Sequence, residues 1–168
     1  MTGTHGKLLI LGIGNTVMAD DGVGVKIIHH LQNHYTFPDN VEILDGGTLG
    51  LDLLPKLESL DRLILVDAIE TGREPGAWVR LAGEELPIAL ETKLSPHQMG
   101  VKDLLAVSQL MGHTPGNMVL YGIQPKSIEM DTELTPEVSA AMEPVLHTLL
   151  DELQSIGVVA VKRPVEKA

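Results

Sequence analysis

The chain alternates short aliphatic runs with longer segments whose apolar residues recur every three or four positions. Short aliphatic runs that end in glycine or other turn residues predict buried strands. Apolar residues at near four-residue spacing predict amphipathic helices, as Val23, Ile27 and Leu31 do. We predict strands at residues 7–14, 41–45, 62–68, 77–81, 118–123 and 158–161, and helices at 23–35, 49–57, 95–111 and 135–156.

This order of elements predicts an α/β fold with three layers. Its centre is a mostly parallel twisted sheet of about five to six strands, with helices on both faces. The strand runs are apolar on both sides, as expected where helices cover both faces of a parallel sheet. A chain of 168 residues is expected to form a single domain that buries roughly 70% of its unfolded surface. Residues 1–6 and 162–168 are expected to be loose.

Polar residues follow two of the predicted strands, where ligands of open α/β sheets bind. The first strand leads through a glycine loop to Asp20 and Asp21, and Asp67 closes the third strand. One acid is enough to cap the helix that follows, so we assign the cap to Asp20. Asp21 is then available for a functional role. An acid directly after an aliphatic strand is hydrogen-bonded, exposed in a cleft or bound to a cation, so structural and functional roles for Asp67 stay open.

His97 is the third candidate. Ser95, Pro96 and Gln98 form a helix start around it, with Ser95 as N-cap, proline at the first helical position and Gln98 completing a capping box. The positive end of the helix dipole disfavours imidazolium, so the ring of His97 is expected to stay neutral and able to coordinate a metal. Two carboxylates and one imidazole suit Ni²⁺, Zn²⁺, Mn²⁺ or Co²⁺ and leave positions open for water or substrate.

Other polar clusters have simpler interpretations. His30 and His34 have the i, i+4 spacing of a metal-binding helix, but the glutamate of a His-Glu-x-x-His motif is missing, so a solvated helix face is the better interpretation. Asp45 follows the second strand and is expected to hold the glycine loop after it. A dinucleotide site is disfavoured because Val17 occupies the place of the third glycine of the Gly-x-Gly motif that begins at Gly12.

Composition narrows the function further. The formal net charge is −11, from 23 acidic and 12 basic residues, which disfavours a nucleic-acid partner. The early apolar run at residues 8–14 is too short to span a bilayer. No cysteine is present, which excludes disulfides, thiolate ligands and a cysteine nucleophile. No Gly-x-Ser-x-Gly elbow of a serine hydrolase is present either. We expect a cytoplasmic protein without a membrane partner.

Five segments, in order between residues 8 and 157, resemble the motifs of the hydrogenase maturation endopeptidases. Any one of them is modest support, whereas five in the same order are strong. The segments are Gly12-Ile13-Gly14-Asn15 with Asp20-Asp21-Gly22-Val23-Gly24; Asp45-Gly46-Gly47-Thr48; Val66-Asp67-Ala68; Ser95-Pro96-His97-Gln98; and Gly122-Ile123-Gln124-Pro125-Lys126-Ser127-Ile128-Glu129 with Leu134-Thr135-Pro136.

The resemblance implies a nickel-dependent endopeptidase, a hydrolase that removes a short C-terminal extension from the precursor of the large subunit of nickel-iron hydrogenase. By motif position, the residues implied to bind the nickel ion and to act in catalysis are Asp21, Asp67 and His97. Asp20 is a minor candidate for the first of these ligands. The nickel is expected to come with the precursor, and other divalent cations to substitute for it in crystals. Two mechanisms remain open: nickel polarises the scissile carbonyl or activates water, or nickel only positions the substrate while a carboxylate acts as base.

A function from another class also remains at this point. The same residues would serve a non-catalytic nickel-binding or nucleotide-binding accessory protein, although the missing third glycine argues against a nucleotide. Cleavage separates the two classes. An endopeptidase shortens the nickel-loaded precursor by a small mass, and an accessory protein leaves it intact.

Overall fold

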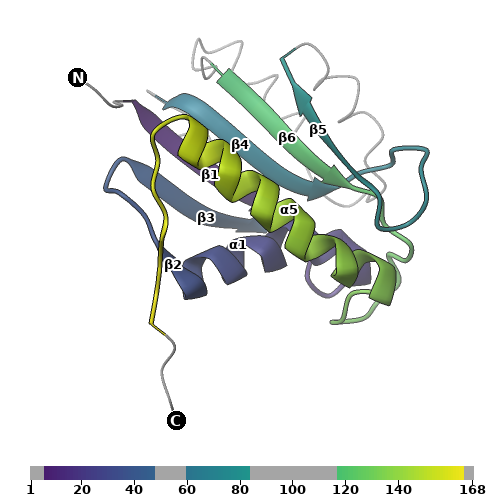
Figure 1. Ribbon diagram of the computed structural model, residues 1–168. Coiled ribbons are helices and arrows are strands. Elements are labelled where there is room, and N and C mark those ends of the chain that lie inside the picture. Colours follow the sequence, from purple (N-terminus) through teal and green to yellow (C-terminus); the bar gives the residue numbers. More distant parts are fainter. Residues whose placement is uncertain (1–5, 48–59, 84–116, 165–168) are drawn as a thin grey trace.

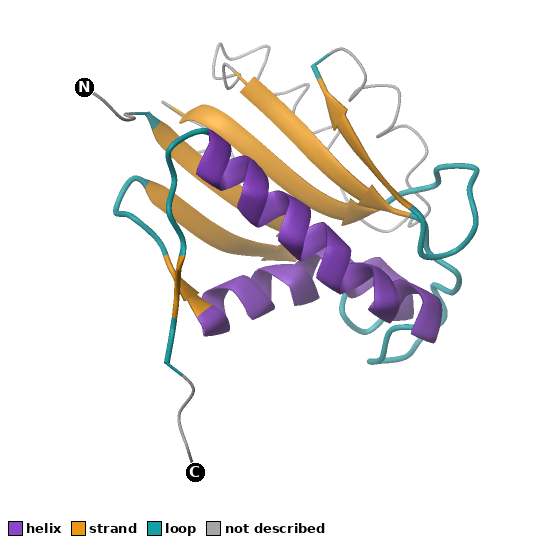
Figure 2. Ribbon diagram, in the orientation of Figure 1, coloured by secondary structure: helices purple, strands orange, loops and turns teal. Residues whose placement is uncertain are grey.

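The central element of the fold is a five-stranded sheet (Figures 1 and 2). The computed structural model describes residues 6–47, 60–83 and 117–164. Four strands run parallel, and β5 is antiparallel to β6. In spatial order the strands are β3 (Val41–Gly47), β1 (Lys7–Ile13), β4 (Leu60–Ala68), β6 (Asn117–Ile123) and β5 (Trp78–Ala82). The predicted α/β class with a mostly parallel sheet is confirmed.

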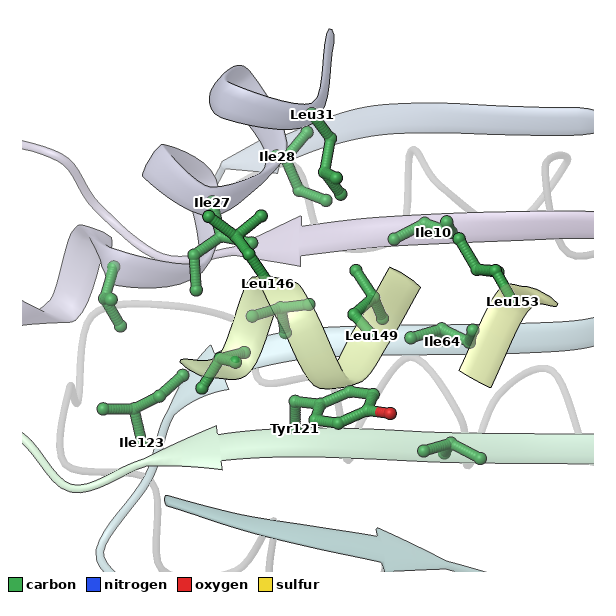
Figure 3. Close-up of a cluster of buried hydrophobic side chains, with 14 of the residues drawn as sticks. Ile10, Ile27, Ile28, Leu31, Ile64, Tyr121, Ile123, Leu146, Leu149 and Leu153 are labelled. Atoms are coloured by element: carbon green, nitrogen blue, oxygen red, sulfur yellow. The ribbon is translucent and has the colours of Figure 1, made fainter. Parts of the chain in front are cut away.

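Two helices pack on one face of this sheet: α1 (Val23–His34) and α5 (Pro136–Ser155). Figure 3 shows how the core between them is filled. Ile27 of α1, Leu149 of α5, and Ile64 and Tyr121 of the sheet all belong to this core, and all four side chains are inaccessible to solvent. The opposite face carries a second apolar cluster that includes Leu9 and Leu65. The helices predicted at residues 49–57 and 95–111 lie outside the described residues.

The chain ends α1 at His34 and continues into a short strand, β2 (Tyr35–Thr36). This strand pairs antiparallel with β7 (Val161–Lys162), in a two-stranded sheet apart from the central one. The predicted strand at residues 158–161 is therefore wrongly placed. The tail predicted to be loose from residue 162 is also too long, because Arg163 N–H donates to His34 O at 2.8 Å. Hydrogen bonds between backbone groups hold the end of the chain against the residues after α1. The pattern of apolar and polar side chains does not reveal this pairing.

The strand order decides where a ligand can bind. The chain passes from β1 to β3 on one side of β1 and then to β4 on its other side. The loops that leave β1 and β4 consequently diverge, and ligands of open α/β sheets occupy the crevice at such a switch point. The register places Gly12 of β1 beside Val66 of β4, and Asp67 beside Gly122 of β6. The segment after β1 that carries Asp21 and the end of β4 that carries Asp67 therefore lie at this crevice.

A polar network ties α5 to the sheet at the edge formed by β5. Arg80 donates from Nε and Nη2 to the two carboxylate oxygens of Glu152, at 2.8 and 2.7 Å, and the Tyr121 hydroxyl donates to the same carboxylate. The hydrogen bonds from Arg80, aided by that from Tyr121, hold the pKa of Glu152 below its ordinary value. Burial first, and the neighbouring carboxylate second, raises the pKa of Tyr121.

Removing the charge of Glu152 is expected to weaken this link. We expect Glu152→Gln to lower the free energy of unfolding by about 1–2 kcal/mol at pH 7, because charge-assisted bonds are replaced by weaker ones and the half-exposed Arg80 is screened by solvent. Since the pKa of Glu152 is lowered by folding, its contribution is complete above the unfolded-state pKa. It is lost as the pH falls through the folded-state pKa. Urea unfolding at several pH values measures it.

The matched control is Glu143→Gln, which changes an exposed glutamate on the same helix. Equal losses of stability in the two variants, or a loss for Glu152→Gln that does not shrink in acid, would contradict the assignment.

Candidate active site at the switch point

The loop after β1 folds back so tightly that only glycine fits at its start. Gly14 has φ +136°, and a Cβ atom there would lie 1.9 Å from the carbonyl oxygen of Asp21. The loop ends in a 3-10 helix, η1 (Ala19–Gly22). Within it, Asp21 Oδ2 accepts a hydrogen bond from Asn15 N–H at 2.9 Å, and the residue is only 1% exposed. The glycine loop thus orients one buried carboxylate rather than cradling a phosphate.

The first turn of α1 rests directly on the ends of β1 and β4. A Cβ atom at Gly24 would lie 2.1 Å from Val66 O and 2.9 Å from Ile13 O, so no larger residue fits there. Asp67 follows Val66 immediately and is 0% exposed. Because η1 also contacts β4, the structure brings the segments that carry Asp21 and Asp67 to the same crevice.

The third predicted residue, His97, lies outside the described residues. Within residues 6–47, 60–83 and 117–164, no cluster of three His, Asp or Glu side chains could hold a metal ion. Two nearly inaccessible carboxylates at one crevice are costly unless they are hydrogen-bonded or neutralised by a cation. The described residues thus include two of the three predicted ligands, and both are carboxylates, which suit a divalent cation.

The structure assigns Asp20 a role that differs from the predicted helix cap. The N-cap of α1 is Gly22, and no side chain caps it. Asp20 is 0% exposed, and its carboxylate instead faces the segment that precedes α5. Its Oδ2 accepts hydrogen bonds from Lys126 N–H, Ser127 N–H and Thr135 Oγ1–H at 2.8–3.0 Å, and its Oδ1 accepts one from Thr135 N–H at 2.8 Å. The N-cap helped by Asp20 is thus that of α5, more than 100 residues away along the chain.

Backbone hydrogen bonds join the same two segments. Asp20 N–H donates to Ser127 O at 3.0 Å, and Ala19 N–H donates to Asp131 O at 2.8 Å. Residues 126–135 are thereby fastened along η1, directly beside Asp21. The segment that precedes α5 thereby supports the acidic loop from one side.

Gln124 is a structural residue that sequence analysis did not single out. It is 6% exposed, and its Oε1 accepts hydrogen bonds from Thr71 N–H at 2.6 Å and from Thr71 Oγ1–H at 2.8 Å. Its Nε2 donates to Glu70 Oε2 at 3.1 Å. Gln124 thus joins the end of β6 to the loop after β4, next to Asp67. The signal that flagged Asp67, a polar residue directly after an aliphatic strand, was present here as well.

The histidines of α1 do not form a metal-binding cluster with other described side chains. His29 and His34 are exposed, in agreement with a solvated helix face. The His30 and His34 rings are in contact, with centroids 4.2 Å apart and ring planes tilted by 35°. Partial burial first, then His34 and Lys162, lowers the pKa of His30. Asp45, predicted to hold its glycine loop, places Oδ2 2.7 Å from His29 Nε2 and so links β3 to α1.

Known proteins match this fold and these motifs. The family model for hydrogenase maturation proteases matches residues 25–152. The hydrogenase 2 maturation protease of Escherichia coli K12 is 41% identical over 158 residues, covering 94% of this chain and 96% of that protein. The hydrogenase expression/formation protein HupD of Thiocapsa roseopersicina is 37% identical over 161 residues, covering 94% of this chain and 72% of that protein.

Solved structures agree. The hydrogenase maturating endopeptidase HybD of Escherichia coli has a TM-score of 0.87 at 41% identity, covering 94% of this chain and 98% of that one. The hydrogenase maturation protease HybD of Thermococcus kodakarensis has a TM-score of 0.68 at 29% identity, covering 88% and 98%. The α/β fold, with buried acids at its switch point, and these matches place the chain in a class of hydrolases that process other proteins. The chain belongs to the hydrogenase maturation protease family and is an endopeptidase.

One further finding concerns membranes. Of the helices that the structure describes, none is long and apolar enough to cross a bilayer.

Proposed function

We propose that this endopeptidase removes the C-terminal extension from the nickel-loaded precursor of the large subunit of nickel-iron hydrogenase. In this proposal Asp21, Asp67 and His97 contact the nickel ion at the crevice between β1 and β4. The observation that carries the proposal is the pair of buried carboxylates, 1% and 0% exposed, brought to one switch point by the packing of Gly24 on Val66. The family membership supports the peptidase over the non-catalytic accessory protein.

The chemistry of the donor set indicates that nickel is part of the substrate. Asp21 and Asp67 are hard oxygen donors, and His97 is the one ligand well matched to Ni²⁺. The chain contains no cysteine that could add a soft donor. Such a set holds nickel only weakly by itself. The precursor therefore brings the metal, and the acids and the histidine complete its coordination within the complex. A precursor without nickel offers them nothing to hold, which prevents premature cleavage.

Cleavage adds water across one peptide bond and releases a new carboxylate and an amine. Nickel in contact with Asp21 and Asp67 would polarise the scissile carbonyl or lower the pKa of the attacking water. Alternatively, nickel positions the substrate while one of the carboxylates takes the proton from water. In either case Asn15 N–H keeps Asp21 in a single orientation before substrate binds. This preorganisation avoids the cost of ordering the carboxylate during the reaction.

The proposed partner is thus the precursor of a hydrogenase large subunit, and the proposed compartment is the cytoplasm. The absence of cysteine agrees with that compartment, because no part of the fold depends on an oxidising environment.

Nickel dependence gives the test of this proposal. Metal-stripped enzyme is incubated with matched nickel-free and nickel-loaded precursor, and the loss of the extension is followed by mass spectrometry. We expect cleavage of the nickel-loaded precursor only, and substoichiometric nickel in the purified enzyme. Precursor reloaded with nickel after stripping serves as the control for damage. Equal cleavage of both forms would refute the proposed recognition of nickel by the enzyme. Failure to cleave either form would refute the proposed substrate.

A further inference from the structure

Two exposed apolar side chains lie on adjoining segments next to the candidate site. Val17 is 48% exposed and Met130 is 85% exposed. They belong to segments that meet in a parallel bridge between Met18 and Asp131. Asp131 N–H donates to Val17 O at 3.1 Å, and Ala19 N–H donates to Asp131 O at 2.8 Å. Val17 lies in the turn just before this bridge and Met130 in the bend just before it, so the two exposed side chains belong to adjoining segments.

This pair is fastened to the carboxylates of the site. Val17 N–H donates to Asn15 Oδ1 at 3.1 Å, and Met18 N–H donates to Asn15 O at 3.0 Å. Asn15 N–H in turn donates to Asp21 Oδ2. On the other segment, Ser127 N–H is held by Asp20 Oδ2 at 3.0 Å. We call Val17 and Met130, on these two anchored segments, the apolar rim of the site.

The surroundings of the apolar rim are acidic. Glu129, Asp131 and Glu133 are exposed on the segment that carries Met130. Two lysines nearby are already engaged, since Lys126 pairs with Glu137 and Lys26 Nζ donates to Thr132 O. A surface with an apolar centre and flanking carboxylates favours a segment that carries an apolar side chain next to basic ones.

We propose that the apolar rim receives the precursor segment beside the scissile bond, through an apolar side chain of that segment flanked by basic residues. This inference rests on the proposed function, because the rim is continuous with the site that cleaves. A second copy of the chain fits poorly, since it would bring a net charge of −11 against the same carboxylates. Two side chains are also far too small an apolar patch for a stable dimer, which buries about 800 Å² on each partner.

The test separates docking from chemistry. In the rim variant, Val17→Ser with Met130→Ser, both changes affect exposed side chains, so the melting temperature should not change. We expect KM for nickel-loaded precursor to rise about tenfold while kcat stays within twofold of the parent. The matched control is Val159→Ser with Val161→Ser, which changes two valines of similar exposure, 62% and 59%, near the other end of the chain. Its KM should equal that of the parent.

Charge is tested in the same assay. In Glu129→Gln with Glu133→Gln, KM is expected to rise and to depend less on salt than the parent KM does. An unchanged KM for the rim variant, an equal rise in the valine control, or an altered oligomeric state of the rim variant in ultracentrifugation would each overturn the docking proposal.

A binding measurement on nickel-loaded precursor keeps the two proposals distinct. If the parent binds the precursor but does not cut it, the proposed function fails alone, and weaker binding by the rim variant still supports docking. If the parent cuts and the rim variant binds as tightly as the parent, docking fails alone.

Discussion

Asp67→Asn is expected to slow processing of nickel-loaded precursor by more than about a hundredfold. Loss of residues that merely support metal ligands costs about 10–100-fold, so loss of a direct contact to the nickel should exceed that range. Asparagine has the shape of aspartate, and it removes a buried negative charge from a side chain that is 0% exposed. We therefore expect the melting temperature to stay within about 4 °C of the parent value, equivalent to about 1 kcal/mol. His97→Ala is expected to abolish processing in the same way.

A suitable control lies on the same strand. Asp61→Asn changes an exposed carboxylate at the opposite end of β4, where Asp61 Oδ2 accepts a hydrogen bond from Lys7 N–H. This variant should process precursor at the parent rate. Normal cleavage by Asp67→Asn would show that Asp67 has no essential role, and an unfolded Asp67→Asn would show that its role is structural. Cleavage and thermal unfolding therefore have to be measured on the same preparations.

Asp20→Ala is expected to produce the largest loss of stability of any single change at the site. Four donors from Lys126, Ser127 and Thr135 lose their acceptor at once. At about 1 kcal/mol or more for each unsatisfied donor, and with some water entering, the loss should be about 3–5 kcal/mol. That corresponds to a fall in melting temperature of roughly 6–20 °C for a chain of this size.

Asp20→Asn should lie between Asp20→Ala and the parent. Its amide oxygen can replace Oδ2 and keep three donors, but its NH₂ group then faces Thr135 N–H. The control is Asp151→Ala, which removes an exposed carboxylate from α5. Thermal unfolding followed by circular dichroism makes the comparison. A loss for Asp20→Ala no larger than for Asp151→Ala would contradict the clamp between η1 and the segment before α5.

Local pattern was sufficient to predict most of the elements described. The aliphatic run ahead of Gly12 predicted β1, and the run that Asp67 closes predicted β4, because strands buried on both faces must be apolar throughout. Thr135 and Pro136 predicted the start of α5. Threonine is a favoured N-cap residue and proline is favoured at the first helical position, so two adjacent residues are enough to mark a helix start. These signals are short-range, so sequence alone carries them.

The contact between η1, which carries Asp21, and β4, which carries Asp67, was also foreseeable, because parallel strands bring their carboxyl ends to one edge of the sheet. The nickel contacts assigned to Asp21, Asp67 and His97 stay a prediction. The pairing of β7 with β2 was not foreseeable, since two-residue ladders depend on backbone groups that every residue carries. Likewise, the link from Asp45 to His29 depends on how α1 settles against β3.

By itself, the sequence determined the class of fold, the family and the acids that are candidates for the site. The spacing of apolar residues, the turn residues and the order of the motifs are local properties of the chain. Only the tertiary structure decided what each acid does. Asp20 and Asp21 are neighbours of the same type, yet one faces Thr135 and the other faces Asn15. The difference arises because a buried carboxylate takes its role from the donors around it, and here some of those donors come from more than 100 residues away.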